Sequence, residues 1–270
     1  MHNLKIGMEN NQIIQFFKED FIKIKNMGPV KSKREGDTGI GKTFSDLLGI
    51  DESNESHPTY GNIKIKTQRD YANTKLSLFT KNPDYPKSAI TKMTKKFGKP
   101  SKMNYLQNTL NTTITTSPNV CYNNWGFYIE FNDDKLYLKI YNYASNQDEE
   151  DIYYIKINKL REIFNKNYHI LAYVNAIHSG KNPETFHYIG CDIFIDGSFD
   201  RFVKLLKMGK IVYEIRVSVD ESGKQKDHGS GFRISKSDLN HLFRSHYTIL
   251  ENGDLIENIN HEQESLDKWY

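Results

Sequence analysis

A complete phosphate-binding pattern lies near the beginning of this chain. Residues 36–43 read GDTGIGKT, which fits G-x-x-x-x-G-K-T. In such a turn, backbone N–H groups and the N-terminus of a helix converge on the phosphates of a nucleotide. That chemistry needs a buried apolar strand before the turn, whereas residues 31–35 carry four charges in five positions. A basic turn that leads into a helix therefore fits these residues better than a nucleotide-binding switch.

A second phosphate-binding candidate is the basic block at residues 64–102. It holds eleven Lys and Arg residues against two acids, Asp70 and Asp84, so its net charge is +9. Because the whole chain carries only +3, the remainder carries −6. Such a block can follow a nucleic-acid backbone, or it can be an ordinary solvated face rich in lysine. The charge pattern alone leaves both interpretations open.

Length and composition set the general class. The chain has 270 residues, 37% of them hydrophobic and 26% charged, which suits one large domain or two closely associated lobes. No apolar run approaches the length of a membrane span, and the first residues lack the apolar stretch of a signal peptide. We therefore expect a cytoplasmic protein with no membrane partner. Cys121 and Cys191 lack metal-ligand spacing, and we expect buried free thiols.

Helices and strands alternate along the chain, which predicts an α/β fold with a mixed sheet. In residues 62–68, alternation predicts a strand with Ile63 and Ile65 on one face and Lys64 and Lys66 on the other. We expect this strand to pair with residues 75–81 as a hairpin. Further strands are expected at 111–116, 125–132, 135–143, 169–178, 210–219 and 232–235, and helices at 11–28, 43–48, 87–98, 157–165, 198–209 and 237–246. The residues after Tyr247 are expected to be weakly ordered.

Several segments together resemble the MvaI/BcnI family of type II restriction endonucleases, which are relatives of the MutH mismatch-repair nuclease. The segments are GDTGIGKTFSDLLGI, PTYGNIKIKTQ, LSLFTKNP, EIRVSV and KDHGSGFRI, in order between residues 31 and 242. The resemblance implies a mixed-sheet, MutH-like PD-(D/E)xK core with two lobes around a DNA cleft. It also implies duplex DNA, and no nucleotide, as the partner. We expect a catalytic-type lobe in residues 1–110, the rest of the core and a DNA-recognition lobe in 111–247, and an acidic tail in 248–270.

The resemblance also identifies the positions of a nuclease site. The family pattern has a glutamate on the helix after GKTF, an aspartate just before a strand, and E-x-K on that strand. Those positions hold Ser45, Thr59, Lys64 and Lys66, so only the final lysine is retained. The missing carboxylates would hold Mg²⁺ beside the scissile phosphate. At about 4 Å and an effective dielectric near 20, Lys64 would instead repel a divalent cation by about 8 kcal/mol.

Two interpretations of this loss remain open. In the first, the chain is a pseudo-nuclease that recognises a short DNA site without a cofactor, in one form as the non-cutting subunit beside a related, active nuclease. Its lysines would then bind a DNA phosphate without metal. In the alternative, it is an active type II endonuclease that cuts a CC-N-GG-like site with Mg²⁺. Its metal ligands would then have moved to Asp51, Glu52 or Glu55.

Candidate DNA contacts also follow from the resemblance. Bases are read by arginine on guanine and by His, Asn or Gln on base edges, and we expect Arg216, His228 and Arg233 to have this role. The two arginines could instead contact phosphates or form surface ion pairs, and His228 could simply cap its turn. Phosphate contacts are expected from eight basic residues, namely Lys31, Lys33, Arg34, Lys42, Lys81, Lys92, Lys95 and Lys96.

Overall fold

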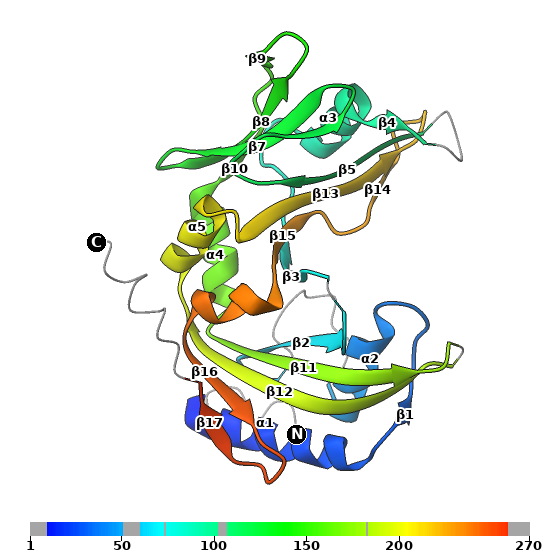
Figure 1. Cartoon of the computed structure of the whole chain (residues 1–270), viewed down its shortest axis with the longest axis vertical. Coiled ribbons are helices and arrows are strands. Elements are labelled where there is room, and N and C mark those ends of the chain that lie inside the picture. The colour runs from blue at the N-terminus through cyan, green and yellow to red at the C-terminus, as the bar shows by residue number, and fades with distance from the viewer. Residues whose placement is uncertain (1–9, 51–59, 73, 102–106, 182, 259–270) are drawn as a thin grey trace. The chain divides into compact units, whose positions relative to one another are not determined.

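The computed structural model describes residues 10–50, 60–72, 74–101, 107–181 and 183–258 (Figure 1). The chain forms two compact units and passes between them several times. Unit 1 comprises Met1–Asn73, Phe164–Ser198 and Asn240–Tyr270, and unit 2 comprises Thr74–Ile163 and Phe199–Leu239. The lobe boundaries near residues 110 and 247 refer to function and stay a prediction.

Unit 1 is built on one mixed sheet with the strand order β17-β16-β12-β11-β2, and β1 pairs with β12. Strands β2 and β11 are parallel, whereas the other pairs are antiparallel. The mixed sheet predicted from the sequence is therefore present. The strands are β1 (Val30–Lys31), β2 (Ile63–Arg69), β11 (Ile170–Ser179), β12 (Thr185–Gly197), β16 (Phe243–Ile249) and β17 (Leu255–Glu257).

Two helices, α1 (Asn10–Asn26) and α2 (Gly39–Leu47), share the hydrophobic core of unit 1 with the sheet. Phe17 and Phe21 lie one helical turn apart on α1 and are fully buried, as a single apolar helix face requires. Ile63 of β2 joins the same core. The predicted alternation in β2 is confirmed, because Ile63 faces this core and the lysines occupy the opposite positions.

Unit 2 contains two further sheets, with the orders β10-β8-β7-β6 and β3-β15-β13-β5-β4. Strands β9 and β14 pair with β8 and β13. Helix α3 (Ala89–Phe97) packs against β5 and β13, α5 (Phe199–Lys207) packs against β13, and α4 (Ile157–Asn167) follows β10. The strands are β3 (Leu76–Thr80), β4 (Lys99–Pro100), β5 (Asn108–Ile114), β6 (Asn119–Tyr122), β7 (Trp125–Phe131), β8 (Lys135–Asn142), β9 (Gln147–Asp148), β10 (Tyr154–Lys156), β13 (Ile211–Val219), β14 (Gln225–Asp227) and β15 (Gly231–Ile234).

Three expectations about these elements were wrong. Strands β2 and β3 do not form a hairpin, because β2 pairs with β11 in unit 1 while β3 pairs with β15 in unit 2. The predicted helix at 237–246 is a short 3₁₀ helix, η2 (Lys236–Leu242), followed by β16. Residues 248–258 after Tyr247 complete β16 and form β17, because both strands extend the sheet beyond β12, while the rest of the tail predicted to be weakly ordered lies outside the described residues.

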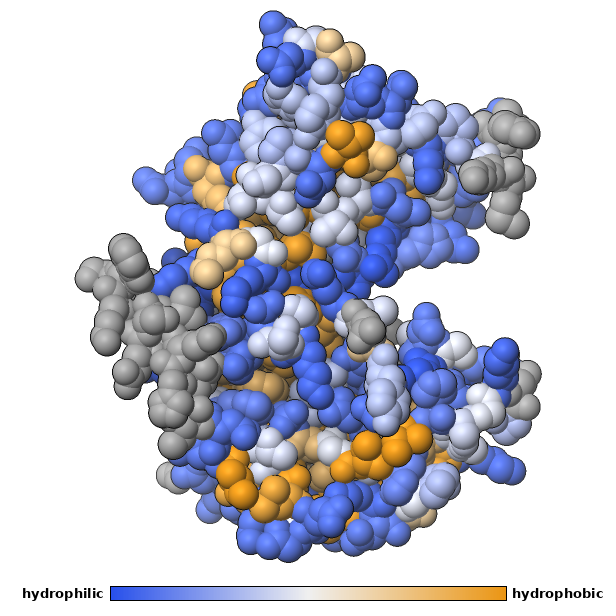
Figure 2. Space-filling model, viewed as in Figure 1, coloured by the Kyte–Doolittle hydropathy of each residue, from blue (hydrophilic) through white to orange (hydrophobic). Residues whose placement is uncertain are grey.

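The face of the protein that Figure 2 shows is mainly polar. In Figure 2, hydrophilic residues dominate the visible face and apolar residues appear in small groups. Both cysteines are free, with Cys191 buried as expected but Cys121 only half-buried, since it lies on β6 at the end of its sheet. None of the helices in the described ranges is long and apolar enough to cross a membrane.

Candidate nucleic-acid interface

Local backbone geometry explains why glycines occupy their positions in GDTGIGKT. Gly36 has a φ of +79°, which side chains rarely adopt. A Cβ atom on Gly39 would lie 2.3 Å from the carbonyl oxygen of Arg34, and one on Gly41 would lie 3.3 Å from Oγ1 of Thr67 on β2. Gly41 therefore allows α2 to pack closely on β2. Gly36 and Gly39 serve the turn that precedes the helix.

This turn lacks the geometry of a nucleotide-binding loop. The preceding strand, β1, has two residues and pairs antiparallel with β12. The N–H of Gly39 donates to the carbonyl of Gly36 at 3.0 Å, and the N–H of Lys42 donates to the carbonyl of Thr38 at 3.0 Å. These N–H groups are engaged within the chain, whereas phosphate binding needs them to point at the ligand. The arrangement supports the interpretation as a basic turn.

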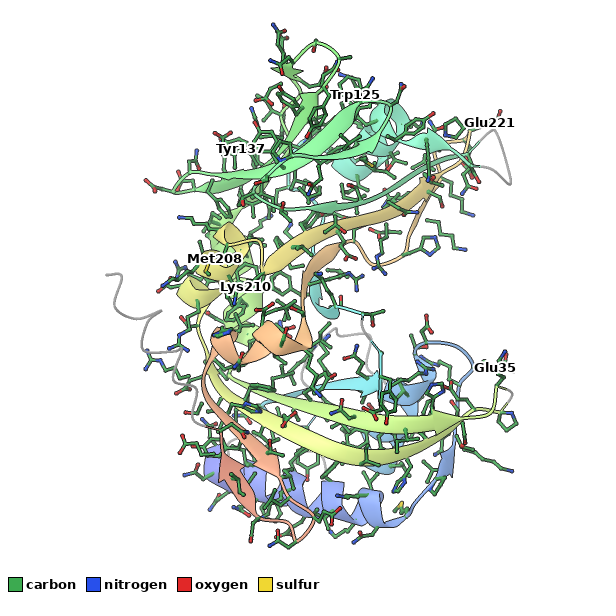
Figure 3. The ribbon with its side chains drawn as sticks, viewed as in Figure 1. Glu35, Trp125, Tyr137, Met208, Lys210 and Glu221 are labelled. Carbon is green, nitrogen blue, oxygen red and sulfur yellow. The ribbon has the colours of Figure 1, made fainter. Side chains whose placement is uncertain are left out.

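An ion pair made by Arg69, at the end of β2, holds this turn in place. Figure 3 labels Glu35 in the turn. Nε and Nη2 of Arg69 each lie 2.7 Å from a carboxylate oxygen of Glu184. Nη2 of Arg69 also donates to the carbonyl of Gly36 at 3.2 Å. The hydrogen bonds from Arg69 lower the pKa of Glu184, and Glu184 raises that of Arg69. One guanidinium thus links β2 to both the glycine turn and the strand pair β11–β12.

Lys64 and Lys66 lie on the same face of β2, as the sequence predicts. Lys64 is 8% exposed, and burial lowers the pKa of its ammonium to about 8. Such a shift is the usual effect of removing a charged group from water. Lys66 is half-buried. The strand position that the sequence resemblance assigned to the family's glutamate therefore holds a buried lysine.

The helix position of the pattern, Ser45, is half-buried on α2. Its neighbour Asp46 is held by two lysines, with Lys42 Nζ at 2.7 Å and Lys33 Nζ at 3.9 Å from its carboxylate oxygens. Lys42 and Lys33, both predicted phosphate contacts, thus share an acidic partner. Thr59 and the proposed relocated ligands Asp51, Glu52 and Glu55 lie outside the described residues.

The described residues that the sequence resemblance assigns to the nuclease site do not fit Mg²⁺. This cation takes oxygen ligands, mainly carboxylates and water, whereas the described positions offer one hydroxyl and two ammonium groups, from Ser45, Lys64 and Lys66. Within the ranges that the structure describes, no group of three or more His, Cys, Asp or Glu residues is placed to hold a metal ion. We therefore derive no hydrolytic step from these residues.

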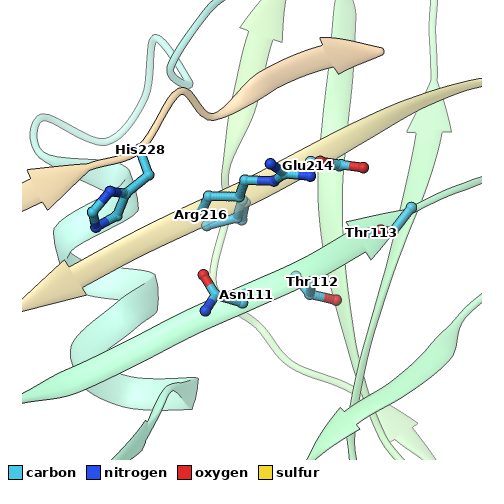
Figure 4. Close-up of a pocket in the computed structure, with 7 residues that line it drawn as sticks. Asn111, Thr112, Thr113, Glu214, Arg216 and His228 are labelled. Atoms are coloured by element: carbon cyan, nitrogen blue, oxygen red, sulfur yellow. Dashed lines mark ion pairs between the residues drawn. The ribbon is translucent and has the colours of Figure 1, made fainter. Parts of the chain in front are cut away.

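Within unit 2, a polar face on β13 and β5 is a separate candidate DNA-binding surface. Glu214 and Arg216 lie on one face of β13, while the alternating Ile215 and Val217 are buried. A pocket of about 500 Å³ opens on this face (Figure 4). It is lined by Asn111, Thr112, Thr113, Glu214, Ile215, Arg216 and His228.

One buried carboxylate holds both predicted base-reading arginines. Nη2 of Arg216 and Nε of Arg233 lie 2.6 and 2.7 Å from the same oxygen of Glu214, which is 7% exposed. Arg233 also donates to the carbonyl of Gly229 at 2.9 Å, and burial lowers its pKa. The side chain of Arg216 is 48% exposed. Arg216 therefore reaches solvent, whereas Arg233 is largely enclosed.

The turn after β14 places His228 in the same pocket. Oδ1 of Asp227 accepts hydrogen bonds from the N–H groups of Gly229 and Ser230, at 2.9 and 2.8 Å. Asp227 thus caps the turn, which frees the imidazole of His228 from that role. The N–H of His228 donates to the carbonyl of Arg216 at 2.8 Å, so the turn is tied to β13.

The predicted phosphate-binding lysines of unit 2 differ in their partners. Nζ of Lys96 lies 3.1 Å from Glu149 and also contacts Asp151, which together raise its pKa. Lys81 lies 2.7 Å from the carboxylate of Asp84. By contrast, Lys92 and Lys95 of α3 are exposed and form no ion pair with any residue that the structure describes. Lys31 and Arg34 are exposed near the glycine turn of unit 1.

Of the residues that line the pocket, the sequence predicted only Arg216 and His228, and the two missed residues that matter most are Glu214 and Asn111. Glu214 was not predicted as a site residue, although its position two residues before Arg216 places both on the same face of the strand. Asn111 was also missed, because an uncharged residue in a polar strand gives no signal until its strand partner is known. The register pairs Asn111 with Arg216 and Thr113 with Glu214.

The fold agrees with the family that the sequence resembles. The chain belongs to the MvaI/BcnI restriction endonuclease family, whose model matches residues 18–243. It is similar to the solved structure of restriction endonuclease MvaI with its cognate DNA substrate, with 27% identity, a TM-score of 0.79, and coverage of 90% of this chain and 100% of that one. It is also similar to MvaI in the absence of DNA, with 26% identity, a TM-score of 0.57, and coverage of 90% and 99%. A comparison with curated proteins found no significant match. The family and the fold class predicted from the sequence are confirmed.

Proposed function

We propose that this chain is a sequence-specific, duplex-DNA-binding protein of the MvaI/BcnI type whose own magnesium-dependent cleavage site is disabled. The observation that carries the proposal is the burial of a positively charged side chain, Lys64, in the predicted nuclease site. Its ammonium is buried on β2 at the position of a family carboxylate, on the same strand face as Lys66. A charge of this sign opposes a divalent cation and favours a phosphate.

Lys64 and Lys66 would bind a phosphate of the DNA backbone directly, without a bridging metal. Lysine is a compact charge that suits phosphate contacts. A phosphate beside Lys64 would favour the protonated amine and raise its lowered pKa. DNA binding should then be accompanied by proton uptake above pH 8. The similarity to MvaI bound to a cognate DNA substrate supports duplex DNA as the ligand.

Sequence recognition is assigned to the polar face of unit 2. Arg216 would present its exposed guanidinium to a base edge, held in orientation by Glu214. Arg233 would support that carboxylate from the buried side, and His228 would contact bases or phosphates from the adjacent turn. As a protein of the restriction-endonuclease type, it would work in the cytoplasm of a prokaryotic cell. A related, active nuclease chain would supply cleavage if the protein acts in a two-chain system.

The experiment is a selection from random duplexes with the purified chain in EDTA. The proposal predicts that a short sequence is enriched in the absence of divalent metal. It also predicts that Lys64→Glu, which restores the family carboxylate, weakens binding in EDTA more than Lys181→Glu at an exposed site. Binding that requires Mg²⁺, or a selection without any preferred sequence, would contradict the proposal.

A further inference from the structure

Asn111 lies directly opposite Arg216 across the β5–β13 pair. Residues paired in this way project from the same face of a sheet, with their Cβ atoms about 5 Å apart. Both side chains line the pocket of about 500 Å³, and Figure 4 shows them beside His228. The pocket therefore presents an amide and a guanidinium side by side.

The amide of Asn111 has no structural task that the fold reveals. Its side chain is exposed and makes no hydrogen bond to any part of the chain that the structure describes. Asparagine is also disfavoured in strands, yet Asn111 lies in the middle of β5. By contrast, Thr109 on the same strand donates to the carbonyl of Lys99 at 3.3 Å. Asn111 thus offers an unused donor and an unused acceptor to a ligand in the pocket.

The chemistry of these two groups matches two different bases. The guanidinium fork of arginine fits O6 and N7 of guanine, and the amide of asparagine fits N6 and N7 of adenine. Neighbouring strands lie about 4.8 Å apart, about 1.4 Å more than the rise of about 3.4 Å between base pairs, a difference that the rotatable side chains of Arg and Asn can span. Paired side chains on β5 and β13 can therefore reach adjacent base pairs.

We infer that Asn111 is a specificity-determining residue that reads adenine in the base pair next to the guanine read by Arg216. This inference rests on the proposed function, since it assigns a role within the same DNA-reading face. It extends recognition from β13 and its following turn to β5. The recognised sequence then includes an A·T pair at a fixed position beside a G·C pair.

The test compares the wild-type protein, Asn111→Ala and Arg216→Ala on the duplex obtained by selection and on its single-base-pair variants. We expect Asn111→Ala to bind all four base pairs equally at one position, adjacent to the position where Arg216→Ala loses its preference. At that position the wild-type protein should prefer adenine by about 5- to 150-fold. Replacing this adenine with 7-deazaadenine, which lacks N7, should weaken DNA binding by the wild-type protein but not by Asn111→Ala.

Asn119→Ala is the matched control, because Asn119 is an exposed asparagine of β6 outside the pocket. It should keep the wild-type preference at every position. The inference is overturned if Asn111→Ala retains the adenine preference, or if it weakens all duplexes equally and lowers the salt dependence as a phosphate contact would. A wild-type protein that selects no sequence would overturn the proposed function itself, which separates the two failures.

Discussion

Replacement of Lys64 by methionine should stabilise the protein at neutral pH and remove a pH dependence of its stability. Methionine has a similar length and no charge, so it suits a side chain that is 8% exposed. Burial lowers the pKa of the lysine from 10.5 to about 8. Each pKa unit corresponds to 1.36 kcal/mol, so the charged lysine costs the folded state about 3 kcal/mol at pH 7.

The sign of the pH dependence follows from proton binding. Between pH 8 and 10.5 the unfolded chain keeps the proton on Lys64 while the folded protein loses it. Wild-type stability therefore gains a favourable contribution as the pH rises through this range. The advantage of Lys64→Met should shrink from about 3 kcal/mol at pH 7 to about 1 kcal/mol at pH 9.5.

Urea unfolding of the wild type and Lys64→Met at both pH values measures this difference. Hydrogen exchange of amides in β2 and β11 would assign the change to unit 1. Lys181→Met, at an exposed position of unit 1, is the control and should change stability by less than about 0.5 kcal/mol. An equal stability difference at pH 7 and pH 9.5 would refute the assignment of a lowered pKa to Lys64.

Three further predictions concern the remaining parts of the interface. Glu214→Gln should destabilise unit 2 by about 1–3 kcal/mol and reduce the preference for guanine, as measured by urea unfolding and by binding to substituted duplexes; an unchanged preference would contradict its orienting role. Glu184→Gln should lower the free energy of unfolding by about 1.5–3 kcal/mol at pH 7. In urea unfolding this loss should diminish as the pH falls below 4.5, because the ionised carboxylate of Glu184, whose pKa is lowered by Arg69, contributes its full stability only above pH 4.5. Lys95→Ala should reduce the slope of log affinity against log salt by about 0.9. Lys96→Ala should reduce it less, because Lys96 is already paired with two acids. A slope for Lys95→Ala equal to that of the wild type would show that Lys95 makes no phosphate contact.

The sequence predicted much of the local structure because local patterns determine it. The alternation in residues 62–68 correctly placed Lys64 and Lys66 on one face, since side-chain direction in a strand has a period of two. The order of strands in the sheets was not predictable in the same way. Strand β2 pairs with β11, more than one hundred positions later, while the next strand belongs to another unit. No local pattern records such a crossing.

The candidate site was predictable only in part. The resemblance named Arg216 and Arg233 as predicted base contacts, but only the ion pairs and burial in the structure show that both share Glu214 and that Arg233 is enclosed. Asn111 becomes a candidate only when strand pairing places it opposite Arg216. Ion pairs such as that of Lys96 were also invisible in the sequence, because its acidic partners lie more than fifty positions away.

The central claim is that the chain reads duplex DNA but does not cut it, and cleavage measures this directly. The purified protein would be incubated with plasmid DNA that contains the selected sequence and CC-N-GG sites, first with Mg²⁺ and then with Mn²⁺. The same sites would be tested for binding by gel shift in EDTA. We predict site-selective shifts with no nicks or cuts under either metal. Discrete cleavage at the bound site, lost when Asp51, Glu52 or Glu55 is replaced by alanine, would show that other carboxylates hold the metal and would contradict the account.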